Sequence, residues 1–531
     1  MKAKILQITS LVALLGSATT VVQADYASTL SGFNPLAYWR LNETTQPPAA
    51  DVAVTTGTLG AAATAYYQGA SVHPVPGALV GSTDSASSFD GTAGTMAFGP
   101  YLPSMHIPAP FTVEAWFNPA VSHAAGSGTL TCALSSGQFA APRTGWLIYQ
   151  SETGWNLRTY NANGTATSLN ITAGPAPSAG VWYHVVATYD GTTVKMYVDG
   201  QLSAQGTPSS YVPGASGGFA IGGRADSSFY WNGAADEVAI YPSALSAADV
   251  AAHYANGTSA SPSAPYQTLV QAKSPVAYYR LGEATYTPPT SLPTAVATGS
   301  LGAAANGSYN PGLQVGAAGP QPPAFSGFSA ANTAPDLNGS AGFVGTQVQM
   351  NDLTEFTMTG WVRRGAVKSG RGGYFGQNDL LEFGDANGGT SVELYVNARG
   401  GNIIAPYPFA DNEWGQFVVT GTTTNTILYA NGREIGRMAG TIESYGTSTY
   451  LFNIGGGGVF NVSGDVFRGS VDEVAILPVA LTPAQVQALY FSAEVVPVVI
   501  TQPSLPARPV YAGYTLSLSV AAQGTAPLSY E

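Results

Sequence analysis

The chain has 531 residues, which is too long for one compact core and suits about two to four domains. Hydrophobic residues make up 45% of it and charged residues only 9%, while 64 glycines and 36 prolines indicate short strands joined by turns rather than long charged helices. The net charge is −12 and no cluster of lysine and arginine is present along the sequence, which argues against nucleic acid as a partner.

Residues 1–24 have the pattern of a signal peptide. Lys2 and Lys4 precede an apolar run over Ile5–Leu15, and cleavage is expected after Ala24. This run is too short to be a membrane span and no later stretch is as long, so we expect no membrane span in the mature chain. The protein is therefore predicted to be exported and to be extracellular, on the cell surface or periplasmic.

The region after the signal peptide has the pattern of antiparallel β-strands. In FTVEAWF, which begins at Phe111, every second residue is apolar, which predicts a strand with one face in a core. Further along, Asp190-Gly191 and Asp199-Gly200 separate alternating stretches, and Asp-Gly in this setting is a strong hairpin signal. Together these patterns predict an antiparallel sandwich.

One short helix is predicted at the end of each strand-rich region. After GAADEVAIY, Ser246 and Asp249 form a capping-box pattern ahead of an apolar series. After GSVDEVAIL, the residues Thr482, Pro483 and Gln485 mark the start of the corresponding helix. Each helix is expected to pack on the edge of a sheet and to close a domain.

The second half of the chain repeats the first in the same order. The matching segments are AYWRLNE and AYYRLGE, TGTLGAAA and TGSLGAAA, FTVEAWF and FTMTGWV, FAIGG and FNIGG, and the two DEV stretches. This long period indicates a duplicated domain rather than a solenoid. We predict one β domain at 25–258, a linker at 259–265 and a second β domain at 266–493. Residues 494–531 have the pattern of the first strands of a third domain.

Taken together, these motifs resemble those of a known family. AYWRL, the FDG turn at Phe89, FTVEAW, WYHVVATYDGTTVKMYVDG and the closing DEVAIY stretch are similar to the concanavalin A-like, laminin-G-like jelly-roll domain of secreted bacterial proteins. Both copies match from end to end. The stretch VYAGYTLSLSVAAQGTAPLSY, within 494–531, resembles the first part of a bacterial immunoglobulin-like domain.

The resemblance implies an all-β fold of two tandem jelly-roll β-sandwiches, each closed by a short helix, followed by the start of an immunoglobulin-like domain. It also implies glycan binding, adhesion or an accessory role beside a catalytic domain, and some members of the family bind calcium at a sheet rim. The single cysteine, Cys132, rules out an intrachain disulfide and fits an exported bacterial chain. Because function varies widely on this fold, the resemblance defines the architecture better than the activity.

The adjacent Asp236 and Glu237 are unusual in a strand that is otherwise apolar. Neighbours on a strand point to opposite faces, so these carboxylates are not expected to form a glycosidase pair, which needs a separation of about 5 Å on one cleft wall. Sandwich-fold β-glucanases carry E-x-D-x-x-E on one strand, and Ala234 stands where the first of these glutamates would be. We therefore expect no enzymatic activity in this chain.

The same alternation places Asp236, and Asp472 in the second copy, on the core-facing side of their strands. A buried carboxylate needs partners. Loop N–H groups, or the recurring Arg40 and Arg280, would satisfy it. The alternative is a calcium ion held together with loop carbonyls, for which Asp90 is a further possible ligand. Both solutions stay open at the level of sequence.

Four aromatic residues are predicted to contact carbohydrate. Trp116 and Trp361 lie on the polar face of matching strands, and Tyr230 and Trp231 lie in the loop before the first DEV strand. An exposed ring of this kind stacks on the apolar face of a sugar. The alternative is that a loop or the second sheet covers these rings, or that they plug the end of the sandwich.

The sequence thus favours a non-catalytic, exported protein that binds polysaccharide or cell-surface glycans, or that acts in adhesion, through jelly-roll loops and exposed aromatics. Two alternatives stay open. One is the non-catalytic front part of a larger secreted glycan-degrading enzyme. The other is a structural spacer of a cell-surface protein.

Overall fold

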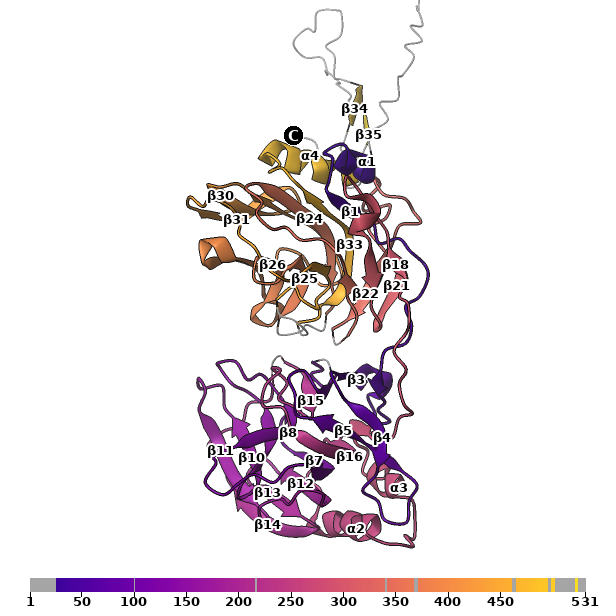
Figure 1. The fold of residues 1–531 in the computed structure, drawn as a ribbon, viewed down its shortest axis with the longest axis vertical. Helices are drawn as coiled ribbons and strands as arrows, with labels where there is room; N and C mark the ends of the chain where they lie inside the picture. Colours follow the sequence, from indigo (N-terminus) through magenta and orange to yellow (C-terminus); the bar gives the residue numbers. More distant parts are fainter. Residues whose placement is uncertain are drawn as a thin grey trace, which may run out of the picture.

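A computed structural model describes residues 25–494 except 100, 215–216, 340, 367–370 and 461–464, and also residues 498–501 and 521–523. Within them, four antiparallel sheets are consistent with two tandem jelly-roll sandwiches. Figure 1 shows the sandwiches one above the other along the longest axis of the molecule. The predicted signal peptide, residues 1–24, lies outside the described residues.

The first sandwich has two facing eight-stranded sheets with a shared aromatic and aliphatic core. One sheet has the order β14 (Gln201–Gly206), β13 (Val194–Val198), β12 (Tyr183–Tyr189), β7 (Phe111–Pro119), β16 (Asn232–Tyr241), β5 (Ser85–Asp90) and β4 (Val72–Pro76), with β17 (Ala277–Tyr279) also on β16. The other has the order β11 (Thr167–Ala173), β10 (Gly154–Tyr160), β9 (Trp146–Ser151), β8 (Leu130–Ser136), β15 (Phe219–Ile221), β6 (Met96–Gly99), β3 (Ala65–Gln68) and β2 (Val52–Ala53).

The second sandwich repeats this arrangement around its own core. Its first sheet has the order β19 (Ala297–Thr298), β1 (Ala37–Trp39), β33 (Arg468–Leu477), β24 (Phe356–Arg364), β29 (Trp414–Gly421), β30 (Asn425–Ala430) and β31 (Arg433–Ala439), with β22 (Thr333–Asn338) on β33 and β21 (Leu313–Ala318) on β22. Its second sheet has the order β18 (Thr294–Ala295), β20 (Gly307–Tyr309), β23 (Val344–Gly345), β32 (Phe452–Ile454), β25 (Gly372–Gln377), β26 (Leu381–Ala386), β27 (Ser391–Val396) and β28 (Gly401–Pro406).

Both predicted closing helices are confirmed, together with their caps. Helix α2 (Ala247–Gly257) has Ser246 as N-cap, and α4 (Pro483–Ala493) has Thr482, each with a complete capping box. Two further helices, α1 (Tyr26–Ser31) and α3 (Tyr266–Gln271), precede β1 and β17. Short 3-10 turns occur at η1 (Gly60–Ala63), η2 (Gly302–Ala305), η3 (Asn387–Gly389) and η4 (Asn397–Arg399).

The predicted hairpin and strand alternation are also confirmed. Asp199 and Gly200, with φ angles of 51° and 75°, form the two-residue turn between β13 and β14. Positive φ at both positions is what a type I′ hairpin turn requires, and Asp-Gly meets that requirement at low cost. Along β7, Phe111 and Phe117 face the core of the first sandwich, as the alternation predicted.

The first strand of each copy lies in the other sandwich. Strand β1 pairs with β33 and β19, both in the second sandwich, and β17 pairs with β16 in the first. Figure 1 shows α1 and β1, in indigo, within the upper sandwich. The predicted boundaries, 25–258 and 266–493, assign each first strand to its own copy, and in this respect the structure differs from the prediction.

Equivalent hydrogen bonds hold the two exchanged segments in place. The carboxylate of Glu283, just after β17, accepts from the Val54 backbone N–H and from the Tyr67 hydroxyl, both at 2.8 Å. The carboxylate of Glu43, just after β1, accepts from the Val296 N–H at 2.9 Å and from the Tyr309 hydroxyl at 2.5 Å. The final glutamate of AYWRLNE and AYYRLGE therefore anchors each segment in the opposite sandwich.

Only short pieces of residues 494–531 are described beyond residue 494. Strands β34 (Val498–Thr501) and β35 (Ala521–Gln523) pair antiparallel. The alternating stretch on which the immunoglobulin-like prediction rests lies outside the described residues, so that domain stays a prediction. In the part of the chain that the structure covers, no helix has the length and apolar character needed to cross a membrane.

Candidate functional site

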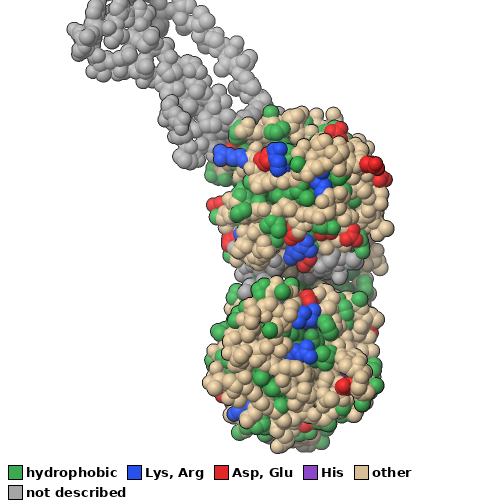
Figure 2. Space-filling model, turned by 90° about the vertical axis from the view of Figure 1, so that its left-hand side faces the viewer, with side chains coloured by type: hydrophobic (Ala, Val, Ile, Leu, Met, Phe, Trp, Pro, Cys, Tyr) green, Lys and Arg blue, Asp and Glu red, His purple; other side chains and the backbone are tan. Residues whose placement is uncertain are grey.

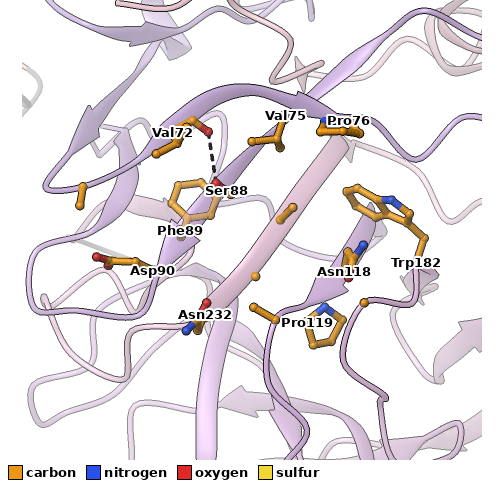
Figure 3. Close-up of a pocket in the computed structure, with 15 residues that line it drawn as sticks. Val72, Val75, Pro76, Ser88, Phe89, Asp90, Asn118, Pro119, Trp182 and Asn232 are labelled. Atoms are coloured by element: carbon orange, nitrogen blue, oxygen red, sulfur yellow. Dashed lines mark hydrogen bonds between the residues drawn. The ribbon is translucent and has the colours of Figure 1, made fainter.

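An open groove of about 560 Å³ lies on the outer face of the first sandwich, where β4, β5, β16 and β7 meet. Gly233 and Ala234 of β16 form part of its lining. Gly233 has no side chain and Ala234 has only a methyl group, which leaves space above the strand. Figure 3 shows Trp182 at one end of the groove and Asp90 at the other, with β16 crossing between them. Val72, which is 55% exposed, lies along one edge.

The lining of this groove combines one large ring with uncharged polar groups. Trp182 is half-buried, and it precedes the first residue of β12. The side-chain amides of Asn118 and Asn232 have no hydrogen-bond partner among the described residues, so their donors and acceptors are free. Asp90 accepts at one oxygen from Thr92, which leaves the other oxygen available. We call this site the Trp182 groove.

The chemistry of the Trp182 groove suits an uncharged sugar. An indole ring offers a flat apolar surface to the C–H face of a pyranose or furanose ring. Free amides and a carboxylate oxygen match hydroxyl groups, which both donate and accept. Among the residues that the structure describes, no lysine or arginine lines the groove. Figure 2 shows a face of the molecule on which charged side chains are few and most of the surface is uncharged.

Three of the four aromatic candidates for carbohydrate contact are buried, which excludes a surface contact for them and agrees with the alternative that these rings are covered. Trp116 is 2% exposed, and Trp361 and Trp231 are 0% exposed. The outer face of β7 and β24, where the first two lie, is covered by the closing helices and the exchanged helices α1 and α3. Trp231 lies in the core and donates from Nε1 to Gln150 at 2.7 Å.

Tyr230 is half-buried and does not line the groove. Trp182, which does line it, was not among the predicted site residues. A signal for it existed in the sequence, because Trp182 begins WYHVV and recurs as Trp414 at the start of the matching stretch. Alternation also places it on the face opposite to the buried Tyr183.

The predicted separation of Asp236 and Glu237 onto opposite faces is wrong, because β16 contains a bulge. Asp236 pairs with Trp116, but Ala239 pairs with Glu114, so β16 has one extra residue. Glu237 takes a φ of 51° at this point. The bulge shifts the alternation and turns Asp236 to the outer face. One oxygen each of Asp236, Glu237 and Asp84 lies within 4.8 Å of the others.

Hydrogen bonds and ion pairs satisfy most of this cluster. Asp236 Oδ2 accepts from the loop N–H of Ala78 at 2.8 Å, so a loop N–H group satisfies this oxygen. The arginine contacts the other carboxylates: Arg280 pairs with Glu237 at 3.4 Å and with Asp84. Asp236 Oδ1 is buried and has no partner within the described residues. Burial raises the pKa of Asp236 to about 8.

The corresponding cluster of the second sandwich has one carboxylate fewer. Asn332 stands where the first sandwich has Asp84, and its Nδ2 donates to Asp472 Oδ2 at 2.7 Å. The other oxygen of Asp472 accepts from the Glu473 backbone N–H at 2.9 Å. Arg40 again pairs with the glutamate, at 3.2 Å. Both oxygens of this aspartate are therefore satisfied by the protein.

The donor sets differ in how well they fit a calcium ion. The first cluster offers three carboxylates, one of them with a buried free oxygen, whereas the second offers a satisfied pair. Asp90 belongs to neither cluster, because it binds Thr92 and lines the groove. Of the three predicted ligands, only Asp236 thus lies in a group that fits a cation, and Asp472 and Asp90 do not.

We expect calcium to stabilise the first sandwich. At 100 times its Kd, the ion should raise the free energy of unfolding by about 2.7 kcal/mol. Asp84→Asn, which copies the second cluster, should remove most of this gain. Thermal melting of the full chain with calcium and with EDTA measures both effects, and identical wild-type curves in the two conditions would contradict cation binding.

A second buried titratable cluster lies beneath α2 and α3. Glu114 of β7 accepts from His184 at 2.9 Å, from His253 at 2.9 Å, from Tyr241 at 2.6 Å and from Tyr266 at 2.7 Å. All five side chains are buried. We call it the Glu114 network. It links four elements of the first copy, β7, β12, β16 and α2, to Tyr266 of the exchanged helix α3.

Protonation in the Glu114 network is set by competition between burial and hydrogen bonding. Burial opposes ionisation of Glu114, but the hydrogen bonds from His184 and His253 outweigh it and lower the pKa of the carboxyl. Burial also opposes protonation of His253, yet the hydrogen bond to Glu114 raises the pKa of that imidazole. Burial raises the pKa of Tyr266 well above its usual value. The network therefore favours a carboxylate with a protonated His253.

Each half of the chain is an antiparallel β-sandwich of two facing sheets, and the first sandwich has an open, mostly uncharged groove on its outer face. The chain belongs to the concanavalin A-like lectin/glucanase superfamily, whose profile matches residues 90–251 and 338–487. No curated protein matches the sequence significantly.

Several solved structures are similar to parts of the chain. Domain 4 of AbnA, an extracellular GH43 arabinanase of Geobacillus stearothermophilus in complex with arabinotriose, is 18% identical over 30% of this chain and 77% of its own, with a TM-score of 0.25. Domains LG4-5 of the mouse laminin α1 chain are 15% identical over 77% of this chain and 94% of their own, with a TM-score of 0.24. A protein of Bacteroides ovatus that is described by its assigned role as carbohydrate-binding is 9% identical over 76% of this chain and 78% of its own, with a TM-score of 0.25. These similarities are too low to support an argument about function.

Proposed function

We propose that the protein is an exported, non-catalytic carbohydrate-binding protein that holds an uncharged glycan in the Trp182 groove. The observation that carries this proposal is the groove itself, where a half-buried indole ring and free amides form a lining that, among the described residues, has no lysine or arginine. Membership of a lectin and glucanase superfamily agrees with it. Export is proposed from the N-terminal signal pattern.

The absence of catalysis is proposed from the state of the carboxylates. Asp236 and Glu237 are close enough to act together, but both are 0% exposed. A glycosidase pair must flank a bound sugar, so it has to lie on the wall of an open cleft. Arg280 already pairs with Glu237. Among the described residues that line the Trp182 groove, Asp90 has the only carboxylate.

Trp182→Ala is expected to weaken glycan binding at least tenfold, which is about 1.4 kcal/mol. The physical reason is the loss of the ring surface on which the sugar packs. A glycan array with the full chain identifies a neutral ligand, and isothermal titration calorimetry measures its Kd for each variant. Trp414→Ala, at the matching position of the second sandwich, is the control and should leave that Kd unchanged.

Two results would contradict the proposal. The first is a wild-type chain that binds no neutral glycan on an array of plant, algal and bacterial sugars. The second is a neutral glycan whose Kd is the same for the wild type and for Trp182→Ala. A melting temperature measured for each variant separates loss of binding from loss of the fold.

A further inference from the structure

The positions of the second sandwich that are equivalent to the lining of the Trp182 groove have different side chains. Strand register gives the equivalent positions of the two sandwiches. Each residue of the first sandwich is followed here by its equivalent in the second: Asn118 by Arg363, Asn232 by Arg468, Trp182 by Trp414, Asp90 by Asn338, and Ser88 by Asp336. Two neutral amides are replaced by two guanidinium groups, a carboxylate by an amide, and a hydroxyl by a carboxylate. The local charge thus changes from negative to positive.

We call Trp414, Arg363, Arg468 and Ser470 the Trp414 surface. The guanidinium carbon of Arg363 lies 5.3 Å from the ring centroid of Trp414, and its Nη2 donates to Ser470 Oγ at 2.9 Å. Arg363 forms no ion pair with any carboxylate that the structure describes. The ring and the hydroxyl therefore hold this guanidinium in place while its remaining N–H groups stay available.

Arg468 is the second cation of the Trp414 surface. Its Nη1 is buried and has no hydrogen-bond partner among the described residues. The carboxylate whose charge acts on Arg468 is that of Asp336. It accepts from Ser470 Oγ at 3.1 Å, and among the described residues it makes no ion pair with either arginine. A buried guanidinium N–H without an acceptor is unfavourable, and a bound anion would supply the missing acceptor.

Other arginines of the chain are used differently. Arg364, the neighbour of Arg363, pairs with Asp385 and with Asp411 and lies over a tyrosine ring. Arg224 pairs with Asp226 at 2.6 Å. These side chains are neutralised within the fold, whereas Arg363 and Arg468 are not. In a chain with net charge −12, two unpaired arginines on one sheet face call for a negatively charged partner.

We propose that the Trp414 surface binds the carboxylate or sulfate group of an acidic sugar. Guanidinium groups match the planar geometry of a carboxylate and accept a sulfate equally well, and Trp414 offers an edge of apolar surface to the sugar ring. The two sandwiches of one chain then bind glycans of different charge. This inference rests on the proposed carbohydrate-binding function but depends on a separate set of residues.

The experiment uses the full chain with three polymers: polygalacturonate, a sulfated galactan and an uncharged galactan. Affinity electrophoresis and calorimetry give the affinity for each, and the two acidic polymers distinguish carboxylate from sulfate. Arg363→Asn, which copies Asn118, is expected to weaken acidic binding at least tenfold and to leave neutral binding unchanged. Arg363→Lys should retain part of the affinity, because it keeps the charge but loses the planar fork. Acidic binding should also weaken as salt is raised.

Trp182→Ala serves as the matched control, because it should weaken neutral binding only. The inference is overturned if neither acidic polymer binds the wild type, or if acidic binding is insensitive both to Arg363→Asn and to Arg468→Asn. Retained neutral binding in that case leaves the proposed function of the Trp182 groove intact. Acidic binding through the arginines without any neutral binding would instead overturn the groove and support the Trp414 surface.

Discussion

Replacing Glu114 by alanine is expected to lower the free energy of unfolding of the first sandwich by about 3–5 kcal/mol. The carboxylate accepts hydrogen bonds from two imidazoles and two phenols, all of them buried. Its removal leaves these donors without an acceptor and leaves the protonated His253 without its counter-charge. Differential scanning calorimetry of the full chain at a fixed pH measures the loss.

The contribution of the Glu114 network to the free energy of unfolding should decrease both at low pH and at high pH. The folded pKa of Glu114 lies below its ordinary value of 4.5, so its stabilisation is present above that value and is lost as the pH falls. The folded pKa of His253 lies above its ordinary value of 6.5, so its stabilisation is complete below 6.5 and is lost as the pH rises through the folded value. The network should therefore stabilise most between about pH 4.5 and 6.5.

Three other charged groups lie near the network: Asp249, Lys273 and Asp199. Asp249 and Lys273 act on His253 with opposite signs, and they form an ion pair with each other at 2.6 Å. Asp199 accepts from the backbone N–H of His184 at 3.0 Å. Asp249 and Lys273 thus oppose each other, and Glu114 is the main group that favours protonation of His253.

The second sandwich supplies a matched control for this prediction. At the equivalent positions it has the neutral residues Thr359, Gln416, Leu477 and Leu489, and Gln416 donates to the hydroxyl of Tyr26 at 3.0 Å. The combined replacements Glu114→Thr, His184→Gln, Tyr241→Leu and His253→Leu should regain most of the stability lost by Glu114→Ala and should flatten the pH dependence. An unchanged pH profile in this variant would contradict the assigned role of the network.

Much of the fold could be predicted because its signals are local. Alternation identified the core face of β7, Asp-Gly identified the β13–β14 turn, and Ser246 and Thr482 identified the helix starts. Each signal depends on residues a few positions apart in the chain, where backbone geometry dictates the outcome. The duplication of these signals also indicated two sandwiches.

The errors arose where non-local structure overrides a local pattern. A one-residue bulge at Glu237 reversed the alternation after Asp236, and period-two reasoning has no means of detecting it. Trp116 was correctly placed on the face opposite the core, yet helices from both copies cover that face. The Trp182 groove combines residues from β5, β7 and β16, so its composition depends on strand register rather than on any single motif.

A disulfide engineered between β16 and β17 is expected to form within one chain. The backbones of Ile240 and Ala277 lie directly opposite each other, at a spacing that suits a disulfide, so Ile240→Cys with Ala277→Cys should cross-link on oxidation. Cys132→Ala in the same chain removes the native thiol. Non-reducing electrophoresis and peptide mass mapping identify the product, which should stabilise the first sandwich by about 2–4 kcal/mol.

The strand exchange is tested by changing only the partner of Ile240→Cys. Ala37 occupies the position of Ala277 in the first copy but pairs with Ile476 of the second sandwich. Ile240→Cys with Ala37→Cys should therefore stay reduced, whereas Ile476→Cys with Ala37→Cys should cross-link. If each copy folded from its own contiguous segment, these outcomes would be reversed, and a cross-linked dimer would show that the exchange occurs between chains. The AYW and AYY segments are similar enough in sequence that each could pair with β16 or with β33. A measurement on residue pairs of this kind therefore distinguishes exchanged from unexchanged first strands.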